Sequence, residues 1–441
     1  MKKNIIFLLL LLLNITIVFA SNTLEVGIPT CTPMIFDMDD DGVNEIIISV
    51  VDPTGASKRI NFIELNGEEF NDEIKQLIIP EGTVLNNINY YVDAEKKYLL
   101  FGGNKDGTSK CKIFSYTTTG DFNWEKEYNF QYLKAPIADY ETEQIYVSLM
   151  KPGAGADGGE MSVLDYSGNE VWSKSYTSGI SSNAVIEDIN VDGEKELIYH
   201  TNDGLLEVLD STFSPLKGFP KKLPRNPSDS FYDFAVKDIN GNRYKEIIVS
   251  SGFTSYQYFF VFDYKGNKIG EIRVNQKCRD IPEVYDFDND GTKEVIITSV
   301  DGKIFVKDLK GKDVSPWPVQ AGSGEMLDSG GNKIRKIVGN PVLLDTDGDG
   351  KPEIIVVALD QTEHKLKVYD LKGNIVDDSI SLGLLNNAPT AKFYSIADLD
   401  MDTNLDLVFI DSSGSGELKV EHIEAPNKTI INEVHRTIEY K

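Results

Sequence analysis

The stretch that decides the fold reads Asp-Thr-Asp-Gly-Asp-Gly-Lys-Pro-Glu over residues 345–353 and runs directly into Ile-Ile-Val-Val at 354–357. Similar acidic stretches begin at Asp37, Asp188, Asp238, Asp286 and Asp398, and degraded copies begin at Asp93 and Asp139. In chain order the eight copies are separated by 56, 46, 49, 50, 48, 59 and 53 residues. A repeat of this length that is built from strands indicates a propeller or a solenoid rather than separate domains.

Each repeat unit reads as four short strands. In the seventh unit, a strand at 341–344 precedes the acidic loop, a nearly all-apolar strand follows at 353–358, and residues 365–370 alternate between polar and apolar. Turn residues at 371–374 then lead into a fourth strand, and the same third strand and turn recur at 163–169, 261–267 and 306–312. Four antiparallel strands are typical of a propeller blade.

A linear β-solenoid is the competing geometry. Its repeats are usually shorter than ~50 residues and lack a four-strand meander, so the pattern favours a closed ring. We therefore expect an all-β protein in which residues 21–441 form a single β-propeller of eight four-stranded blades. We expect the ring to close by pairing of residues 23–28 with strands near 429–434.

Large aromatic residues recur in the fourth-strand region of four units, at Trp124, Trp172, Phe219 and Trp317. Such residues can stack on sugar rings, but recurrence at one place in successive units favours packing between blades, because large aromatics dominate core burial.

The acidic loops have the pattern of a calcium site. Calcium prefers several hard oxygen ligands, and Asp at positions 1, 3 and 5 of a tight loop supplies three carboxylates. A backbone carbonyl at position 7 and an acidic residue at position 9 would add further oxygens, while Gly at position 6 permits a positive φ. The predicted Ca2+ ligands are Asp37, Asp39, Asp41, Val43 and Glu45; Asp188, Asn190, Asp192, Glu194 and Glu196; Asp238, Asn240, Asn242, Tyr244 and Glu246; Asp286, Asp288, Asp290, Thr292 and Glu294; Asp345, Asp347, Asp349, Lys351 and Glu353; and Asp398, Asp400, Asp402, Asn404 and Asp406.

The loops differ in completeness. Those that begin at 37, 286 and 345 carry every element, and the loop at 188 substitutes only Asn at position 3. The loop at 238 has two Asn ligands and Arg243 in place of the glycine, which we expect to weaken both its charge and its turn, and the loop at 398 has Thr403 at that position. The copies at Asp93 and Asp139 lack enough ligands, and we expect metal-free turns there.

Two alternatives to this calcium site were weighed. An EF-hand needs helices around its loop, whereas strand residues follow here at once, so it is rejected. The other alternative is an Asx-type turn without an ion, but four carboxylates held together without a cation would repel one another.

The bulk composition indicates an exported protein. Residues 1–20 have the lysines, apolar run and small terminal residues of a signal peptide, and no later stretch has the ~18 apolar residues of a membrane span. The net charge is −26, and it becomes −28 when Lys2 and Lys3 are removed with the signal peptide. Such a negative charge repels phosphates and argues against nucleic acid as a partner. The expected location is secreted, periplasmic or at the cell surface.

Cysteine is scarce. The chain has three cysteines, Cys31, Cys111 and Cys278, which is an odd number, and they are far apart in the sequence. A disulfide framework is therefore excluded, and all three thiols are expected to be free.

The acidic loops, their position between the first and second strands, and the length of the unit resemble the FG-GAP or VCBS-type repeats of exported bacterial proteins and of the integrin α-subunit propeller. This resemblance implies a calcium-stabilised propeller used for adhesion or ligand binding. The chain departs from the family in that the Phe-Gly and Gly-Ala-Pro dipeptides are mostly missing, apart from Phe-Gly-Gly at 101–103.

Nothing in the sequence reads as a catalytic site. The four histidines, His200, His364, His422 and His435, form no cluster with cysteine or with a nucleophile motif. We expect a non-enzymatic binding or adhesion module for a protein or glycan ligand. A propeller enzyme, such as a calcium-dependent polysaccharide lyase or a quinone-dependent dehydrogenase, and a purely structural surface protein remain as alternatives.

The ligand is expected on the face opposite the acidic loops. In a four-strand meander, the second-to-third loops and the connections between blades share that face. The basic residues of these connections are Lys134, Lys221, Lys222, Arg225, Lys277, Arg279, Lys333, Arg335 and Lys336. We hypothesise that an anionic partner, such as an acidic glycan, binds there by charge steering, although solvated loop charges are the plainer interpretation.

Overall fold

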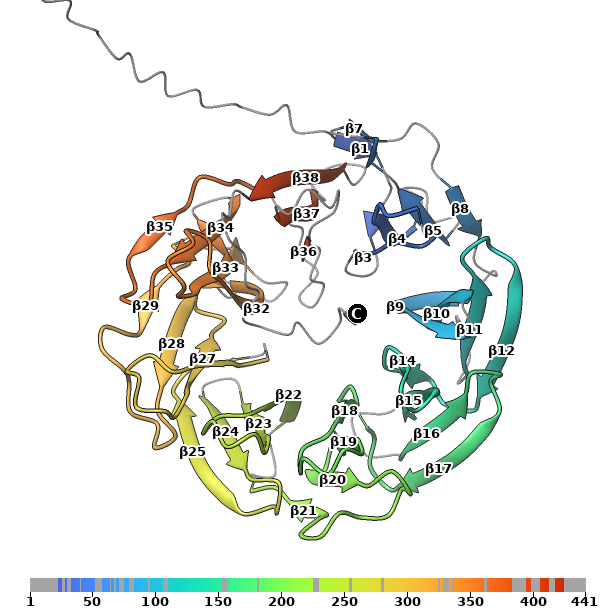
Figure 1. The fold of residues 1–441 in the computed structure, drawn as a ribbon, viewed down its shortest axis with the longest axis horizontal. Helices are drawn as coiled ribbons and strands as arrows, with labels where there is room; N and C mark the ends of the chain where they lie inside the picture. The colour runs from blue at the N-terminus through green and yellow to red at the C-terminus, as the bar shows by residue number, and fades with distance from the viewer. Residues whose placement is uncertain are drawn as a thin grey trace, which may run out of the picture.

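The structure is a computed structural model that describes residues 23–423 with short gaps between strands, the longest at 383–393 and 398–404. Its strands form eight four-stranded blades arranged in a ring, as Figure 1 shows, so the expected all-β propeller is confirmed. The predicted signal peptide at 1–20 lies outside the described residues. The described part of the chain contains no helix long and apolar enough to cross a membrane.

Each blade is an antiparallel meander whose first strand lies nearest the centre of the ring (Figure 1). Blade 1 contains β2 (Ile28–Pro29), β3 (Met34–Phe36), β4 (Glu45–Val51), β5 (Lys58–Ile63) and β8 (Lys75–Ile78). Blade 2 contains β9 (Thr83–Asp93), β10 (Lys96–Lys105), β11 (Cys111–Thr117) and β12 (Phe122–Tyr128). Blade 3 contains β13 (Tyr132–Leu133), β14 (Ile137–Asp139), β15 (Gln144–Met150), β16 (Gly159–Asp165) and β17 (Glu170–Tyr176). Blade 4 contains β18 (Val185–Glu187), β19 (Glu196–His200), β20 (Leu205–Leu209) and β21 (Lys221–Lys222).

The remaining blades follow the same order. Blade 5 contains β22 (Ser230–Lys237), β23 (Glu246–Phe253), β24 (Tyr256–Phe262) and β25 (Lys268–Val274). Blade 6 contains β26 (Glu283–Tyr285), β27 (Glu294–Thr298), β28 (Lys303–Lys307) and β29 (Val319–Gln320). Blade 7 contains β32 (Ile337–Leu344), β33 (Glu353–Asp360), β34 (Glu363–Tyr369) and β35 (Ile375–Asp377). Blade 8 contains β36 (Tyr394–Ala397), β37 (Leu405–Asp411), β38 (Glu417–Ile423) and β1 (Thr23–Glu25). Two small hairpins, β6 (Leu65–Asn66) with β7 (Glu69–Phe70) and β30 (Met326–Leu327) with β31 (Lys333–Ile334), lie outside the blades.

The ring closes through the N-terminal strand. Strand β1 is the outermost strand of blade 8, and its residues 23, 24 and 25 pair with residues 419, 418 and 417 of β38. The expectation that this segment closes the ring is confirmed, but the expected partner near 429–434 is wrong. Blade 8 already has its first three strands by Ile423, so the vacant outer edge of the sheet belongs to β38.

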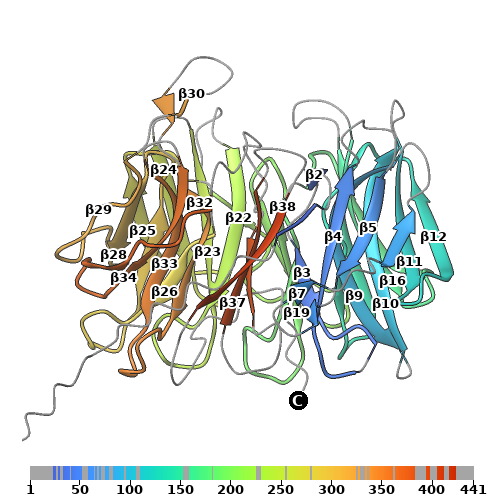
Figure 2. The ribbon, with the colours of Figure 1, turned by 90° about the horizontal axis from the view of Figure 1, so that it is seen from above.

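The hydrophobic core lies in the seams between blades. The second strands β19 and β27 are buried at every residue, because each is flanked by two strands of its own sheet and covered by a neighbouring blade. The cluster between blades 4 and 5, for example, joins Ile198 and Leu206 to Phe234 and Ile247. Figure 2 shows the strands running across the thickness of the ring, so each seam extends from one face to the other.

The recurring aromatics pack on the next blade along the chain. The indole Nε1 of Trp124 donates a hydrogen bond to the carbonyl of Tyr166 at 2.8 Å. The ring of Trp172 stacks on Phe213, with centroids 4.9 Å apart, and Trp317 is buried in the cluster of blades 6 and 7. The prediction of packing between blades is therefore confirmed for these three residues, and buried Phe219 lies in the equivalent seam.

Each of these aromatics meets the turn between the third and fourth strands of the next blade. Gly168 and Gly373 occupy such turns with φ of 80° and 75°. A Cβ on Gly168 would lie 2.7 Å from the Trp124 ring, and one on Gly373 would lie 2.9 Å from Val319 beside Trp317. Glycine is required here both for its left-handed conformation and for the close approach of the blades.

We predict that Trp317→Ala lowers the free energy of unfolding by about 3–5 kcal/mol, because the substitution leaves a cavity in the seam between blades 6 and 7. Urea denaturation measures the change. The control is Phe122→Ala, whose side chain is 57% exposed and which should change stability by less than about 0.5 kcal/mol. Equal effects of the two substitutions would contradict the assignment of the core to the seams.

Candidate metal-binding loops

The acidic loops join the first and second strands of their blades, and five of the six are described. All five share one set of hydrogen bonds. The position-1 carboxylate accepts the position-6 backbone N–H at 2.9–3.1 Å, and the position-5 side chain accepts the position-7 N–H at 2.7–2.9 Å. The buried glutamate at position 9 accepts the position-2 N–H at 2.6–3.0 Å. The repeat in the sequence is thus a repeat in geometry.

Two positions take left-handed backbone conformations in the loops at 188, 238, 286 and 345. At position 6, φ is 84–91° for the four glycines and 75° for Arg243. The backbone N–H of Arg243 also donates to Asp238, so the turn at 238, which we expected to be weakened, keeps the hydrogen bond of the glycine-containing loops. At position 4, φ is also positive, for Val191, Gly241, Asn289 and Gly348, which the sequence pattern did not indicate.

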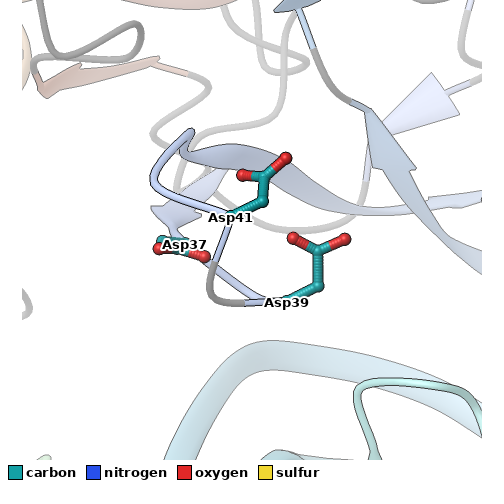
Figure 3. Close-up of side chains that lie close together, drawn as sticks. All are labelled: Asp37, Asp39 and Asp41. Carbon is teal, nitrogen blue, oxygen red and sulfur yellow. The ribbon is translucent and has the colours of Figure 1, made fainter.

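Carboxylate oxygens converge in three of the loops. Within the described residues, one ligand atom from each member lies within 4.8 Å of the others in the groups Asp37, Asp39 and Asp41; Asp286, Asp288 and Asp290; and Asp345, Asp347 and Glu353. Figure 3 shows the first group, whose three side chains come from one short loop after β3. These are the same three loops that carry every predicted ligand type.

The loops at 188 and 238 are arranged differently. In each, the position-3 asparagine donates its amide N–H to the position-9 glutamate, from Asn190 to Glu196 and from Asn240 to Glu246, both at 2.9 Å. A hydrogen bond from the asparagine amide therefore stabilises part of the negative charge of the glutamate, which a cation would otherwise balance. The Oδ1 atom of Asn190 is buried and accepts no hydrogen bond, so it is an oxygen that a cation can use.

Four of the position-9 glutamates are electrostatically unfavourable as anions. Burial raises the pKa of Glu45 to about 7 against the lowering effect of the Met38 N–H, and Asp39, Asp37 and Asp41 raise it further. Burial likewise raises the pKa of Glu196 to about 7 and raises the pKa values of Glu246 and Glu294. A bound cation would relieve both the burial cost and the repulsion, so the donor set fits a hard divalent ion.

Most of the predicted ligands in the loop at 398 lie outside the described residues. Asp398, Asp400, Asp402 and Asn404 lie outside the described residues, and Asp406 is buried in β37. The degraded copies are shorter turns, because Asp93 pairs directly with Lys96 and Asp139 with Gln144 across their hairpins. Neither turn has the length of the nine-residue loops.

Lysines from the next blade reach back to several of these loops, which the sequence pattern did not reveal. The Nζ atom of Lys195 lies 2.5 Å from Asp139 Oδ1, and that of Lys245 lies 2.6 Å from Glu187 Oε1. The backbone N–H groups of Lys245 and Lys293 also donate to the carbonyls of Ile189 and Ile239 in the preceding loops. The signal that was available is the Lys-Glu pair at positions 8 and 9, which recurs at 195, 245 and 293.

On the opposite face, one of the predicted basic residues is paired with an acidic neighbour. Lys222 forms a 2.6 Å ion pair with Asp203, from the second-to-third loop of its own blade. Asp301 and Asp360, which also belong to this face, pair with Lys303 and Lys367. Arg225, Arg279, Arg335 and Lys336 lie outside the described residues.

No catalytic arrangement emerges from the described histidines and cysteines. His200 and His364 are buried, and the Nδ1 atom of His200 lies 3.4 Å from the carbonyl of Thr201. Cys111 and Cys278 are buried and form no disulfide, which confirms the prediction for these two residues, while Cys31 lies outside the described residues. Burial raises the pKa of the Cys111 thiol to about 12, so it carries little of the reactive thiolate at neutral pH.

We predict that the native protein resists thiol reagents at Cys111 and Cys278, because both side chains are buried. Labelling with and without denaturant, followed by mass spectrometry of the peptides, measures this. Denatured protein should yield three thiols without reductant. Fewer than three would contradict the expectation that all the cysteines are free.

Comparison with known proteins supports the fold and does not assign a family. No family model matches the chain, and no curated protein matches it. Among solved structures, the rhamnogalacturonan lyase YesW is 14% identical, with a TM-score of 0.63 over 90% of this chain and 72% of that one. The C-terminal WD40 domain of Sif2 is 12% identical, with a TM-score of 0.52 over 93% of this chain and all of that one. At such identities these likenesses show the propeller fold alone.

Proposed function

We propose that the chain is an exported, calcium-stabilised β-propeller of the FG-GAP or VCBS type that acts as a non-enzymatic binding module. The observation that carries the calcium proposal is the convergence of three carboxylates in each of the loops at 37, 286 and 345. The hydrogen-bond pattern shared by five loops supports the calcium proposal, because backbone N–H groups hold the acidic side chains in place without an ion. Preorganised ligands reduce the cost of ordering on binding.

In this proposal the ion is held by the side chains at positions 1, 3, 5 and 9 of each loop and by the backbone carbonyl at position 7. When bound, calcium supplies positive charge and no redox chemistry. The protein's own residues do the rest: the position-1 aspartate orders the turn, and the buried glutamate ties the loop to the second strand. The loop at 188 has one fewer carboxylate and the loop at 238 two fewer, so we expect weaker binding there.

We predict that chelation lowers the melting temperature of the mature protein. A ligand at 100 times its dissociation constant stabilises the native state by about 2.7 kcal/mol per site, and that contribution is lost with the free ion. Differential scanning calorimetry in calcium and in excess chelator measures the change, with magnesium as the control ion.

A matched pair of variants identifies the loops as the source. Asp347→Ala removes a member of a converged group and should shrink the calcium-dependent shift, whereas Asp93→Ala alters a short turn and should leave it unchanged. A melting temperature that ignores chelator would refute the structural role of calcium.

The proposed ligand is a protein or a glycan, and an anionic glycan is the form that the basic connections favour. The likeness to a rhamnogalacturonan lyase favours a second candidate, that the chain acts on an acidic polysaccharide rather than only binding it. Non-enzymatic propellers are matched as well, such as the WD40 domain of Sif2, and the described residues present no histidine or cysteine cluster suited to acid-base chemistry. Binding therefore remains the first proposal.

One experiment separates these proposals. The protein is passed over immobilised acidic polysaccharide in calcium at low salt, and the soluble polysaccharide is monitored for the ultraviolet absorbance of an unsaturated lyase product. We expect retention without product, and weaker retention for the combined variant Lys222→Glu, Arg279→Glu and Arg335→Glu, because charge reversal opposes steering. Product formation would favour the lyase, and unchanged retention of the variant would remove the anionic-ligand proposal.

A further inference from the structure

The third blade has an acidic turn whose charge is balanced from within the chain. The Nζ atom of Lys195 lies 2.5 Å from Asp139 Oδ1 and 2.7 Å from Glu141 Oε2. The other oxygen of Asp139 accepts both the backbone N–H and the hydroxyl of Thr142, each at 2.9 Å. Asp139 is buried, and the ring of Tyr140 lies 5.3 Å from the ammonium on a further side.

The turn occupies the same place in its blade as the metal-binding loops. Asp139 ends the first strand β14, as Asp37 and Asp345 follow β3 and β32, and it keeps the hydrogen bond from the residue three positions on that Asp345 accepts from Gly348. The turn is shorter, however, and its second strand begins with Gln144 rather than glutamate. The turn still has acidic residues at positions 1, 3 and 5, which are Asp139, Glu141 and Glu143, and Lys195 bridges the first two.

Lys195 comes from the neighbouring blade and from a defined position. It is residue 8 of the loop at 188, adjacent to the buried Glu196 of that loop. The equivalent lysine of the following blade, Lys245, pairs with Glu187, which precedes the acidic loop of blade 4 and is not one of its ligands. Among the described lysines at this position, Lys195 is therefore the one seated between two carboxylates of an acidic turn.

We propose that the ammonium of Lys195 takes the place of a metal ion in the third blade, so that this blade keeps its inner turn ordered without calcium. The inference rests on the proposed function for its contrast with other blades, because it sets the third blade apart from those whose loops are proposed to bind calcium. Blades 3 and 4 are then joined at this turn by the ion pairs of Lys195, and this cation cannot dissociate because it is part of the chain. When free calcium falls, the loops at 37, 286 and 345 should open while the turn at 139–144 stays closed.

Amide hydrogen exchange of the mature protein, read by mass spectrometry, tests this blade by blade. In the parent protein, excess chelator should speed exchange in peptides that cover 37–48, 286–297 and 345–356 and leave 139–149 unchanged. In Lys195→Met, which keeps the aliphatic stem but loses the charge, exchange over 139–149 should rise about tenfold or more in either condition, since a buried carboxylate loses its partner. The matched control is Lys222→Met, whose ion pair with Asp203 is exposed and which should leave exchange over 139–149 as in the parent.

Two further variants keep the test decisive if Lys195→Met folds poorly. Lys195→Arg retains a cation and should preserve protection over 139–149, and adding Asp139→Asn to Lys195→Met should restore it, because the buried charge is then gone. The inference is overturned if Lys195→Met exchanges like the parent over 139–149, or if Asp139→Asn fails to rescue it. Parent loops that ignore chelator would instead refute the calcium proposal, and loss of protection in Lys195→Met would still stand as evidence for the role of the lysine.

Discussion

The structure depends on a buried carboxylate at the start of the second strand. In five described blades this glutamate is nearly inaccessible to solvent and accepts the N–H of loop position 2, which fixes the loop against the core. A buried anion is costly unless it is paired and hydrogen-bonded. Every blade with this glutamate therefore needs positive charge or hydrogen-bond donors close to the start of its second strand.

The blades meet this requirement in different ways. Three loops gather carboxylates closely enough to share a cation, and under the proposed function calcium supplies it. The loops at 188 and 238 direct an asparagine amide at the glutamate. The third blade has Gln144 in place of the glutamate, and Lys195 lies between two of the carboxylates of its turn. The ring is regular in its backbone and varied in its electrostatics, so under the proposed function the response to calcium differs between blades.

The seams follow a second rule that is independent of the loops. An aromatic from the end of one blade lies on a glycine turn of the next, as Trp124 does on Gly168. In blade 5 the residue aligned with Trp172 is Gly270, and there the N–H of Glu271 donates directly to the carbonyl of Leu309 in the next turn. Hydrophobic burial between blades and backbone contact at the turns together hold the ring, and N-terminal strand β1 closes it by completing blade 8.

The sequence by itself determined the repeat, the four-strand unit, the eight blades and the loops that carry complete ligand sets. These properties are local, because each can be recognised in contiguous residues. They are a repeat period of about fifty residues, the alternation of polar and apolar residues along a strand, and a nine-residue acidic pattern. Only the tertiary structure decided that β1 pairs with residues 417–419, that Arg243 keeps its turn and that Lys195 reaches Asp139. Pairing across the ring and between blades joins residues distant in the sequence, and the side chain of one blade reaches the loop of another only after the blades have assembled. No local pattern encodes such contacts, since they depend on which strands become neighbours.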